Sequence, residues 1–233
     1  MTDSTVMLIT GTSRGIGRSL VEYYTEAGCQ VIGCSRTLIN EDLQNYYHYC
    51  LDIGDEPTVK KMFSDIRKRY GRLDVLINNA GIASMNHSMI TPIHTVRSVL
   101  ETNVIGTFLF CREAARLMQP RRCGRIINFT TVAIPLKLEG EAVYAASKAA
   151  VITLTHIMAK EFGSFGITVN AIGPSPIKTD LIRGVSKEKL ELLIQSQAIK
   201  RYGEYKDVIN VIDFFISPKS DFITGQVLFL GGA

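Results

Sequence analysis

Tyr144 and Lys148 stand four positions apart in the segment YAASK, and this pair carries the clearest chemical signal in the chain. In a helix, residues with this spacing share one face, so the Lys148 ammonium would lie beside the Tyr144 phenol. A nearby positive charge favours the phenolate and lowers the phenol pKa from its ordinary value of about 10. Tyr144 could then donate or accept a proton near neutral pH. Alone the spacing is weak evidence, because the same pair makes ordinary surface contacts in many helices.

A glycine-rich turn near the N-terminus forms a second group of residues suited to chemistry. The segment TGTSRGIG places Gly11, Gly15 and Gly17 after an apolar segment and at the start of a helical pattern. Glycines let the backbone approach a diphosphate, and the helix N-terminus that follows offers free N–H groups. A plain glycine-rich turn is the alternative interpretation. The position in a first βαβ unit favours the dinucleotide, because open α/β sheets bind ligands at the carboxyl ends of their strands.

The elements that must position these residues follow from an alternation of short apolar segments with longer helical patterns. Predicted strands cover residues 6–10, 30–34, 48–51, 75–78, 125–130, 168–172 and 227–230. Predicted helices cover residues 16–27, 57–70, roughly 93–118, 143–162, 187–197 and 205–216. The strands are rich in Val, Ile and Leu without strict alternation, so helices should cover both faces of the sheet. The pattern predicts an α/β fold, a doubly wound (Rossmann) seven-stranded parallel sheet in a single domain of residues 1–233.

Composition excludes several classes of protein. The 233 residues are 46% hydrophobic and 21% charged, with a net charge of +4 and basic residues too scattered to predict nucleic-acid binding. The five cysteines include no CxxC, and the four histidines are dispersed, so no metal site is predicted. The N-terminus lacks a basic leader, and no apolar run approaches the ~18 residues of a membrane span. We therefore expect a cytoplasmic protein that is not embedded in a membrane.

The G-x3-G-x-G spacing of the turn resembles that of the short-chain dehydrogenase/reductase family. The resemblance continues through NNAG at 78–81, Asn103 in ETNVIGTF and the Tyr144/Lys148 pair, and it reaches the closing FITGQVLFLGG. It implies that Tyr144 donates a proton to a carbonyl as hydride arrives from a nicotinamide. Lys148 would hold the ribose hydroxyls and lower the pKa of Tyr144. The backbone carbonyl of Asn103 would position a water for proton relay to Lys148.

One position departs from the family pattern. Family members usually place Ser thirteen residues before the Tyr, where it hydrogen-bonds the substrate carbonyl, and this chain has Thr131. Threonine keeps the hydroxyl, but its β-branch restricts χ1 and adds a methyl group. Thr130 is a less favoured alternative, because adjacent side chains of a strand face opposite sides of the sheet.

Cofactor selectivity should be set at the end of the second predicted strand, in VIGCSR. Where an acid would bind the ribose hydroxyls of NAD, this chain has Ser35 followed by Arg36, and Arg14 in the glycine turn adds a second guanidinium. These residues favour NADPH. By resemblance, Asp52 contacts the adenine. The other predicted cofactor-binding residues are Gly11, Ser13, Gly15, Ile16, Gly17, Ile53, Asn79, Ala80, Gly81, Tyr144, Lys148, Pro174, Ile177 and Thr179.

The substrate is less well defined by the sequence. Residues 181–201 are expected to form a helical cap over the substrate, and Ser175 replaces the glycine usual after Pro174. The length and C-terminal segment resemble the 3-oxoacyl-(acyl carrier protein) reductase branch. Arg122 matches one of two arginines that this branch uses for docking, whereas Phe165 occupies the other position. The expected activity is NADPH-dependent reduction of a carbonyl in a small molecule or acyl thioester, with an acyl carrier protein as a candidate partner.

Two further questions stay open at this point. Because Thr131 and Ser175 depart from the pattern, the alternative function is a dinucleotide-binding protein with weak or no catalysis, acting as a sensor or assembly partner. The resemblance also implies a homodimer or homotetramer that pairs through the helix carrying the YxxxK motif. On that helix Ala145, Ala149 and Ile152 have helical spacing, and burial inside one subunit would explain them as well. His156 completes this stripe.

Overall fold

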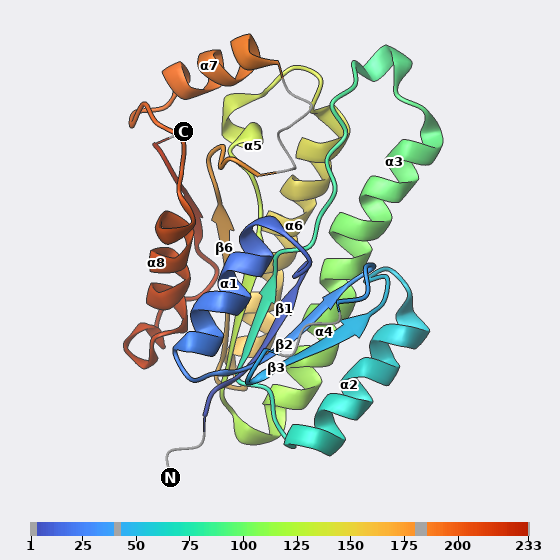
Figure 1. The fold of residues 1–233 in the computed structure, drawn as a ribbon, viewed down its shortest axis with the longest axis vertical. Coiled ribbons are helices and arrows are strands. Elements are labelled where there is room, and N and C mark those ends of the chain that lie inside the picture. The colour runs from blue at the N-terminus through green and yellow to red at the C-terminus, as the bar shows by residue number, and fades with distance from the viewer. Residues whose placement is uncertain (1–3, 40–42, 180–185, 233) are drawn as a thin grey trace.

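The computed structural model describes residues 4–39, 43–179 and 186–232, which contain one seven-stranded parallel sheet (Figure 1). The strand order is β3-β2-β1-β4-β5-β6-β7. The strands are β1 (Val6–Thr10), β2 (Gln30–Ser35), β3 (Tyr46–Cys50), β4 (Val75–Asn78), β5 (Gly124–Phe129), β6 (Ile167–Gly173) and β7 (Val227–Phe229). The predicted fold class, a doubly wound parallel sheet of seven strands, is confirmed.

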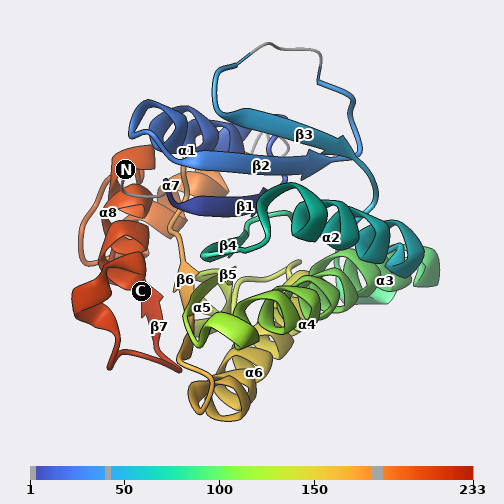
Figure 2. The ribbon, with the colours of Figure 1, turned by 90° about the horizontal axis from the view of Figure 1, so that it is seen from below.

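Helices cover both faces of this sheet, as the strand composition predicts (Figure 2). On one face lie α1 (Gly15–Glu26) and α8 (Tyr205–Ile216), whose buried side chains form one apolar cluster with β1 and β5. On the other face α2 (Glu56–Tyr70), α4 (Thr107–Met118) and α6 (Ala142–Gly163) enclose a second cluster. The inner strands β1, β4 and β6 are buried along their whole length, because they are covered on both faces.

Helix boundaries follow the local signals. Gly71 ends α2 with a left-handed φ of 67°, and its N–H donates to the carbonyl of Arg67. A capping box begins α8, where Glu204 and Asp207 each accept a hydrogen bond from the backbone N–H of the other. Both helices therefore lie within one residue of their predicted bounds.

The predicted continuous helix 93–118 is wrong in its middle. The segment divides into α3 (Ile93–Leu100), a π-helical turn η2 (Glu101–Gly106) and α4. Asn103, in the wide turn, uses its side chain to accept from the N–H of Ile82 and to donate to the carbonyl of Ile82, both at 2.9 Å. These bonds to a neighbouring loop stabilise the insertion of a residue into the helical ladder, which apolar periodicity does not reveal.

Smaller differences affect the ends of elements and the short helices. Strand β3 begins at Tyr46, two residues before the predicted start, because Tyr46 and Tyr47 pair with Val31 and Ile32. The short helix α5 (Ala133–Leu136) follows β5 and was not expected. The remaining elements are α7 (Lys187–Ser196) and the 3-10 turns η1 (Ser88–Ile90), η3 (Gln119–Arg121) and η5 (Pro218–Ser220).

The sheet brings the candidate residues to one edge. Strand β1 has β2 on one side and β4 on the other, so the direction of the chain across the sheet reverses at β1. Parallel strands end at the same edge, so the glycine turn after β1, the NNAG loop after β4 and the segments after β5 and β6 meet there. This edge is where a ligand site is expected in a doubly wound sheet.

Candidate active site

The glycine turn has the backbone that a phosphate site requires. Gly11 and Gly15 adopt left-handed φ values of 74° and 60°. A side chain at Gly17 would place its Cβ 2.6 Å from Asn79 Nδ2 and closer still to the carbonyl oxygen of Gly11. The first turn of α1 has no side-chain cap and no acidic residue, so no carboxylate competes for its N–H groups. The turn can therefore present backbone donors and a partial positive charge to a diphosphate.

The loop after β4 is fastened to this turn. The Asn79 side chain donates to the carbonyls of Thr10 and Gly11 at 2.9 and 3.2 Å, and the N–H of Ala80 donates to Thr10 Oγ1 at 2.9 Å. These bonds hold the predicted residues Asn79, Ala80 and Gly81 against the glycine turn. Two motifs nearly seventy residues apart thus form one rigid wall of the site.

Behind this wall lies a fully buried polar network centred on Asn103. Its Nδ2 donates to Ser147 Oγ at 2.9 Å, and the Ser147 hydroxyl donates to the carbonyl of Tyr144 at 2.7 Å. The backbone carbonyl of Asn103 accepts from Thr107 Oγ1 at 2.8 Å. The π-helical turn is therefore bonded to both the NNAG loop and the first turn of α6.

Lys148 is buried and bonded to the end of β5. Its Nζ donates to the carbonyl of Phe129 at 2.8 Å, and only 4% of the residue is exposed. Burial disfavours the ammonium and lowers the pKa of Lys148 to about 8. A Cβ at Gly81 would lie 3.1 Å from this Nζ, so the lysine packs closely against the NNAG loop.

The prediction that Lys148 lowers the pKa of Tyr144 does not hold in this structure. Burial raises the pKa of Tyr144 to about 12, and the charge of Glu141 raises it further, whereas hydrogen bonding with Thr131 lowers it. Lys148 makes no resolved contribution, because its ammonium is directed at Phe129 and is itself disfavoured by burial. Burial therefore favours the protonated form of the Tyr144 phenol, the form that can donate a proton.

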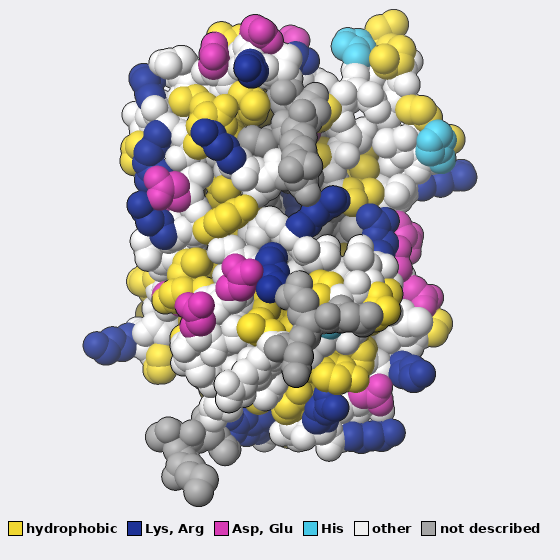
Figure 3. Space-filling model, in the orientation of Figure 1, with side chains coloured by type: hydrophobic (Ala, Val, Ile, Leu, Met, Phe, Trp, Pro, Cys, Tyr) yellow, Lys and Arg dark blue, Asp and Glu magenta, His cyan; other side chains and the backbone are white. Residues whose placement is uncertain are grey.

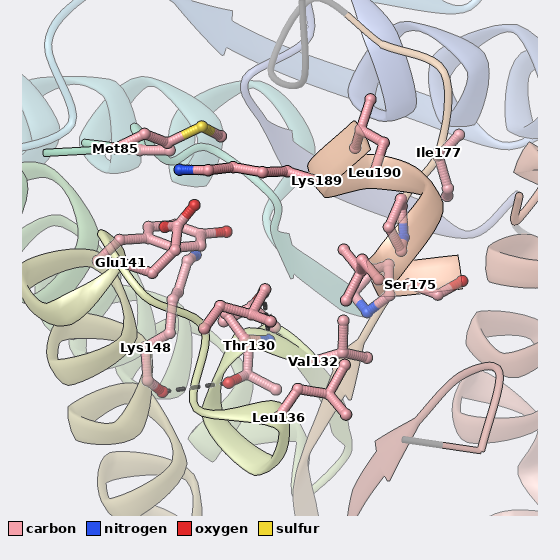
Figure 4. Close-up of a pocket in the computed structure, with 18 of the residues that line it drawn as sticks. Met85, Thr130, Val132, Leu136, Glu141, Lys148, Ser175, Ile177, Lys189 and Leu190 are labelled. Atoms are coloured by element: carbon pink, nitrogen blue, oxygen red, sulfur yellow. Dashed lines mark hydrogen bonds between the residues drawn. The ribbon is translucent and has the colours of Figure 1, made fainter. Parts of the chain in front are cut away.

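The two adjacent threonines after β5 have different partners. The Thr130 hydroxyl donates to the carbonyl of Lys148 at 3.2 Å (Figure 4). The Thr131 hydroxyl accepts from the N–H of Ala133 at 3.2 Å and interacts with the phenol of Tyr144. The structure therefore places Thr131, and not Thr130, beside the candidate proton donor.

The end of β2 contains a hydrogen-bonded cluster that the sequence did not reveal. Ser35 is buried, and its Oγ donates to the carbonyl of Thr37 at 2.9 Å and lies 3.1 Å from His48 Nε2. His48 Nδ1 lies 2.8 Å from the hydroxyl of Tyr46, which donates to Thr12 Oγ1 at 2.9 Å. Burial lowers the pKa of His48, which favours the neutral ring. These contacts join the glycine turn to β3.

Gly33 is the sequence signal that could have indicated this cluster. A Cβ at this β2 glycine would lie 2.5 Å from Thr12 Oγ1, within the space that the Tyr46 hydroxyl occupies. An isolated glycine inside a strand often marks the close approach of another group. Arg36, next to Ser35, is exposed at the same edge and available to a ligand.

Asp52, assigned to the adenine, and Ile53, predicted to bind the cofactor, differ from each other in exposure. Asp52 is exposed, and its Oδ1 accepts from the N–H of Gly54 at 2.9 Å, which fixes the turn after β3. The Ile53 side chain is buried at 6% exposure and packs beneath Gly106 in the core. Only the backbone of Ile53 can therefore face a cofactor.

Several of the predicted residues line a cavity of about 520 Å³ at the carboxyl ends of β5 and β6 (Figure 4). Thr131, Tyr144 and Lys148 lie on its lining, whereas Asn103 lies behind it. The predicted cofactor-binding residues on the same lining are Ile16, Asn79, Gly81, Pro174, Ile177 and Thr179. One cavity thus extends from the candidate proton donor to Ile16 of the glycine turn.

The predicted cap is described in part. Residues 180–185 lie outside the described residues, whereas α7 contributes Lys189, Leu190, Leu192, Leu193 and Ser196 to the cavity lining. Ser175, which replaces the usual glycine, is buried, and a Cβ at Gly203 would lie 3.0 Å from Ser175 Oγ. This serine packs beneath the segment that follows the cap.

Other classes of site find little support in the described part of the chain. No group of three His, Cys, Asp or Glu residues there could hold a metal ion. Basic and acidic side chains are interspersed over the face seen in Figure 3.

Helix α6 is long and apolar enough to meet the length and composition criterion for a membrane span, whereas the sequence analysis expected no such segment. Helix α6 packs against β5 and β6 with a third of this apolar window buried, and length and composition alone are weak evidence for a membrane span.

Comparison with known proteins decides the family. A family model described as enoyl-(acyl carrier protein) reductase matches residues 11–232. The 3-oxoacyl-(acyl-carrier-protein) reductase FabG of Salmonella typhimurium is 32% identical, and the match covers 97% of this chain and 96% of that protein. FabG of Staphylococcus epidermidis is 34% identical with the same coverage. The chain belongs to the short-chain dehydrogenase/reductase family.

Solved structures agree with the fold described above. ElxO with NADP bound superposes with a TM-score of 0.89 at 30% identity and covers 97% of each chain. A 4-hydroxyisoleucine dehydrogenase complexed with NADH superposes with a TM-score of 0.88 at 28% identity and 98% coverage of each chain. The chain is accordingly an enzyme of a family of nicotinamide-dependent oxidoreductases.

Proposed function

We propose that this short-chain dehydrogenase/reductase is an NADPH-dependent carbonyl reductase in which Tyr144 supplies the proton. The observation that carries the proposal is the shared cavity, whose lining brings the hydrogen-bonded pair Tyr144 and Thr131 together with Ile16 of the glycine turn. The reductive direction requires a protonated phenol, and burial of Tyr144 favours that form.

The residues present fit a dinucleotide. The diphosphate would lie on the N-terminus of α1, where Gly11 and Gly15 hold the open turn and Gly17 leaves room for the backbone. Ser13, Asn79, Ala80 and Thr179 border the same path. When bound, reduced nicotinamide supplies the hydride that adds to the carbonyl carbon. Pro174 and Ile177, which line the cavity, are the apolar residues available to pack against its ring.

The chain's own groups perform the proton transfer. Thr131 and Tyr144 direct hydroxyls toward the carbonyl oxygen, so hydrogen bonds orient the substrate before the phenol proton moves to that oxygen. Lys148, held by the carbonyl of Phe129, has its ammonium at the ribose side of the cavity beside Gly81. The carbonyl of Asn103 keeps one lone pair beyond its bond to Thr107 and is the candidate anchor for a relay water.

NADP(H) is the proposed cofactor because the end of β2 has positive charge nearby and carries no acidic residue. Arg36 is exposed at that end, Arg14 begins α1, and Ser35 stands where an acid would repel a 2′-phosphate. The bound NADP of the ElxO structure supports the same choice. The cluster of His48, Tyr46 and Thr12 would hold Ser35 in place.

A 3-oxoacyl thioester is the leading candidate substrate, on the strength of the FabG relatives. Docking of an acyl carrier protein is supported more weakly. Arg122 donates to the carbonyl of Ser164 at 2.7 Å and so already has a structural partner, and Phe165 replaces the second arginine. We assign the part of the cap at 186–201, which includes α7, to substrate enclosure, since five of its residues line the cavity.

A homodimer or homotetramer in the cytoplasm completes the proposal. Helices α3, α4 and α6 and the π-helical turn expose the apolar residues Ile93, Leu100, Ile105, Phe108 and Ile157, each at least 40% accessible. Such a surface favours pairing of two copies through these helices. Light scattering at several protein concentrations measures the assembly, and a concentration-independent monomer mass would contradict it.

A panel of ketones and 3-oxoacyl thioesters, assayed by NADPH and NADH oxidation, tests the function. We expect turnover with NADPH on at least one class and at least tenfold lower kcat/KM with NADH. Cofactor binding is measured in parallel by calorimetry. Tight NADPH binding without turnover on any carbonyl would favour the alternative, a dinucleotide-binding sensor or assembly partner.

A further inference from the structure

Glu141 is a buried acid in the substrate cavity with no role in the reaction described above. Only 9% of the residue is exposed, and its Oε2 has no hydrogen-bond partner among the described residues. Buried carboxylate oxygens are normally hydrogen-bonded, since leaving one unpaired costs the desolvation of the group. The burial of Glu141 also raises the pKa of its carboxyl.

The position of Glu141 directs this carboxyl at the reacting group. Glu141 is the N-cap residue of α6, but its side chain accepts no bond from the helix N–H groups. Its backbone carbonyl accepts from the N–H of Ala145 at 2.7 Å, which begins the helical ladder. Tyr144, three residues later, lies on the same face, and both side chains line the cavity (Figure 4).

The protein itself leaves the acid unsatisfied. The neighbouring lining is largely apolar and includes Val132, Leu136, Leu190 and Leu193. Two lysines also line the cavity, but Lys148 donates to the carbonyl of Phe129. The charge of Lys189 reaches Glu141 from α7, yet the two groups form no ion pair within 4.0 Å.

We propose that Glu141 determines substrate specificity by accepting a hydrogen bond from an N–H or O–H group next to the reduced carbonyl. This inference rests on the proposed carbonyl reduction, since it places the carbonyl at Tyr144. A site that holds a buried acceptor discriminates strongly against an analogue without the donor, because the acceptor is then left unpaired. The preferred substrate is therefore a ketone with a hydroxyl or amine close to the carbonyl, rather than a plain alkyl ketone or the 3-oxoacyl thioester of the FabG relatives, which carries no such donor next to its ketone.

Matched substrates and two variants test the inference. The substrates are a plain ketone, its hydroxy ketone and its amino ketone of equal chain length. Turnover is measured with NADPH, and binding of each ketone to the NADP⁺-loaded enzyme is measured by calorimetry. We expect the parent to prefer the donor-bearing ketones by about 10- to 100-fold in kcat/KM and in affinity. Glu141→Leu should reduce that ratio to near one.

Glu141→Gln separates the two donors. A neutral amide oxygen still accepts from a hydroxyl, so the preference for the hydroxy ketone should persist in part, whereas the preference for a charged amine should be lost. Glu161→Gln, an exposed acid near the opposite end of α6 and outside the cavity lining, is the matched control and should keep both ratios.

The outcomes distinguish this inference from the function on which it rests. Absence of turnover with all three ketones, with the binding preference intact, would contradict the reductase and support the role of Glu141 as a recognition group. Equal binding of the three ketones by the parent would overturn the role of Glu141. So would equal losses for all three in Glu141→Leu and Lys189→Met, because an ion pair that closes α7 over the cavity would then explain the acid.

Discussion

The cofactor side and the substrate side of the cavity are built differently. On the cofactor side, Asn79 and Thr10 bond the NNAG loop to the glycine turn, and no buried side-chain N or O atom described there lacks a hydrogen-bond partner. On the substrate side, the carboxyl of Glu141 is unsatisfied, and α7 places Lys189 and Leu192 at the cavity with most of Leu192 exposed. The fold alone fixes the positions of the residues on the cofactor side. The arrangement of the substrate side is completed only when a ligand binds.

The substitution with the largest expected effect disrupts the cofactor side of the cavity. Gly17→Val would place side-chain atoms against the carbonyl of Gly11 and the amide of Asn79, where there is no space. We expect a loss of about 3 kcal/mol in the free energy of unfolding and no measurable NADPH binding. Urea denaturation and calorimetry measure the two. Gly163→Ala, at a helical glycine with open space around it, is the control and should leave both unchanged.

Arg36→Asp tests whether charge at the end of β2 sets cofactor choice. The substitution replaces a guanidinium by a group that repels a 2′-phosphate and can bind the ribose hydroxyls of NAD. We expect the ratio of kcat/KM for NADPH to that for NADH to fall by about 100-fold, as steady-state kinetics would show. Arg97→Asp, on exposed α3, should not change it. An unchanged ratio in Arg36→Asp would mean that another group binds the phosphate.

Lys148→Met tests the electrostatic cost of burying the Lys148 ammonium between the cofactor side and the substrate side of the cavity. The Lys148 pKa falls from 10.5 to about 8 on folding, so its burial costs stability when the group is charged, below pH 8, and no longer does so above pH 10.5. The stability of the variant relative to the parent should therefore decline by about 3 kcal/mol as pH rises through this window. Urea denaturation under reducing conditions measures it. A pH-independent difference would mean that Lys148 has an ordinary pKa.

Thr131→Ser has the smallest expected effect. Serine keeps the hydroxyl beside Tyr144 and removes only a methyl group, so kcat should stay within about threefold of the parent or rise. Thr131→Val keeps the shape without the hydroxyl and should lower kcat by more than tenfold. Steady-state kinetics on the best substrate compares them. A large fall in Thr131→Ser would assign the methyl group a part in positioning the substrate.

The sequence predicts the cofactor side of the cavity better than the substrate side, for a physical reason. Glycines such as Gly17 are required by backbone contacts, so their spacing identifies the turn and places it on the correct strand. The sheet follows from equally local patterns. The π-helical turn depends on bonds between Asn103 and Ile82, which are distant in sequence and leave no periodic signal.

The direction of the Tyr144 pKa shift was mispredicted because spacing alone does not reveal burial. The four-residue spacing correctly brings Lys148 to the same cavity as Tyr144. It does not reveal that Lys148 donates to the carbonyl of Phe129 or that the charge of Glu141 raises the pKa of the phenol. Both facts depend on the packing of α6 against the sheet.

Tyr144→Phe tests the central claim most directly. The substitution removes only the phenol oxygen, so NADPH affinity measured by calorimetry should stay within about twofold while kcat for ketone reduction falls by about 100- to 10,000-fold. Single-turnover measurement of NADPH oxidation on the best ketone provides the rate. Retention of the parental rate by Tyr144→Phe would contradict the assignment of Tyr144 as the proton donor.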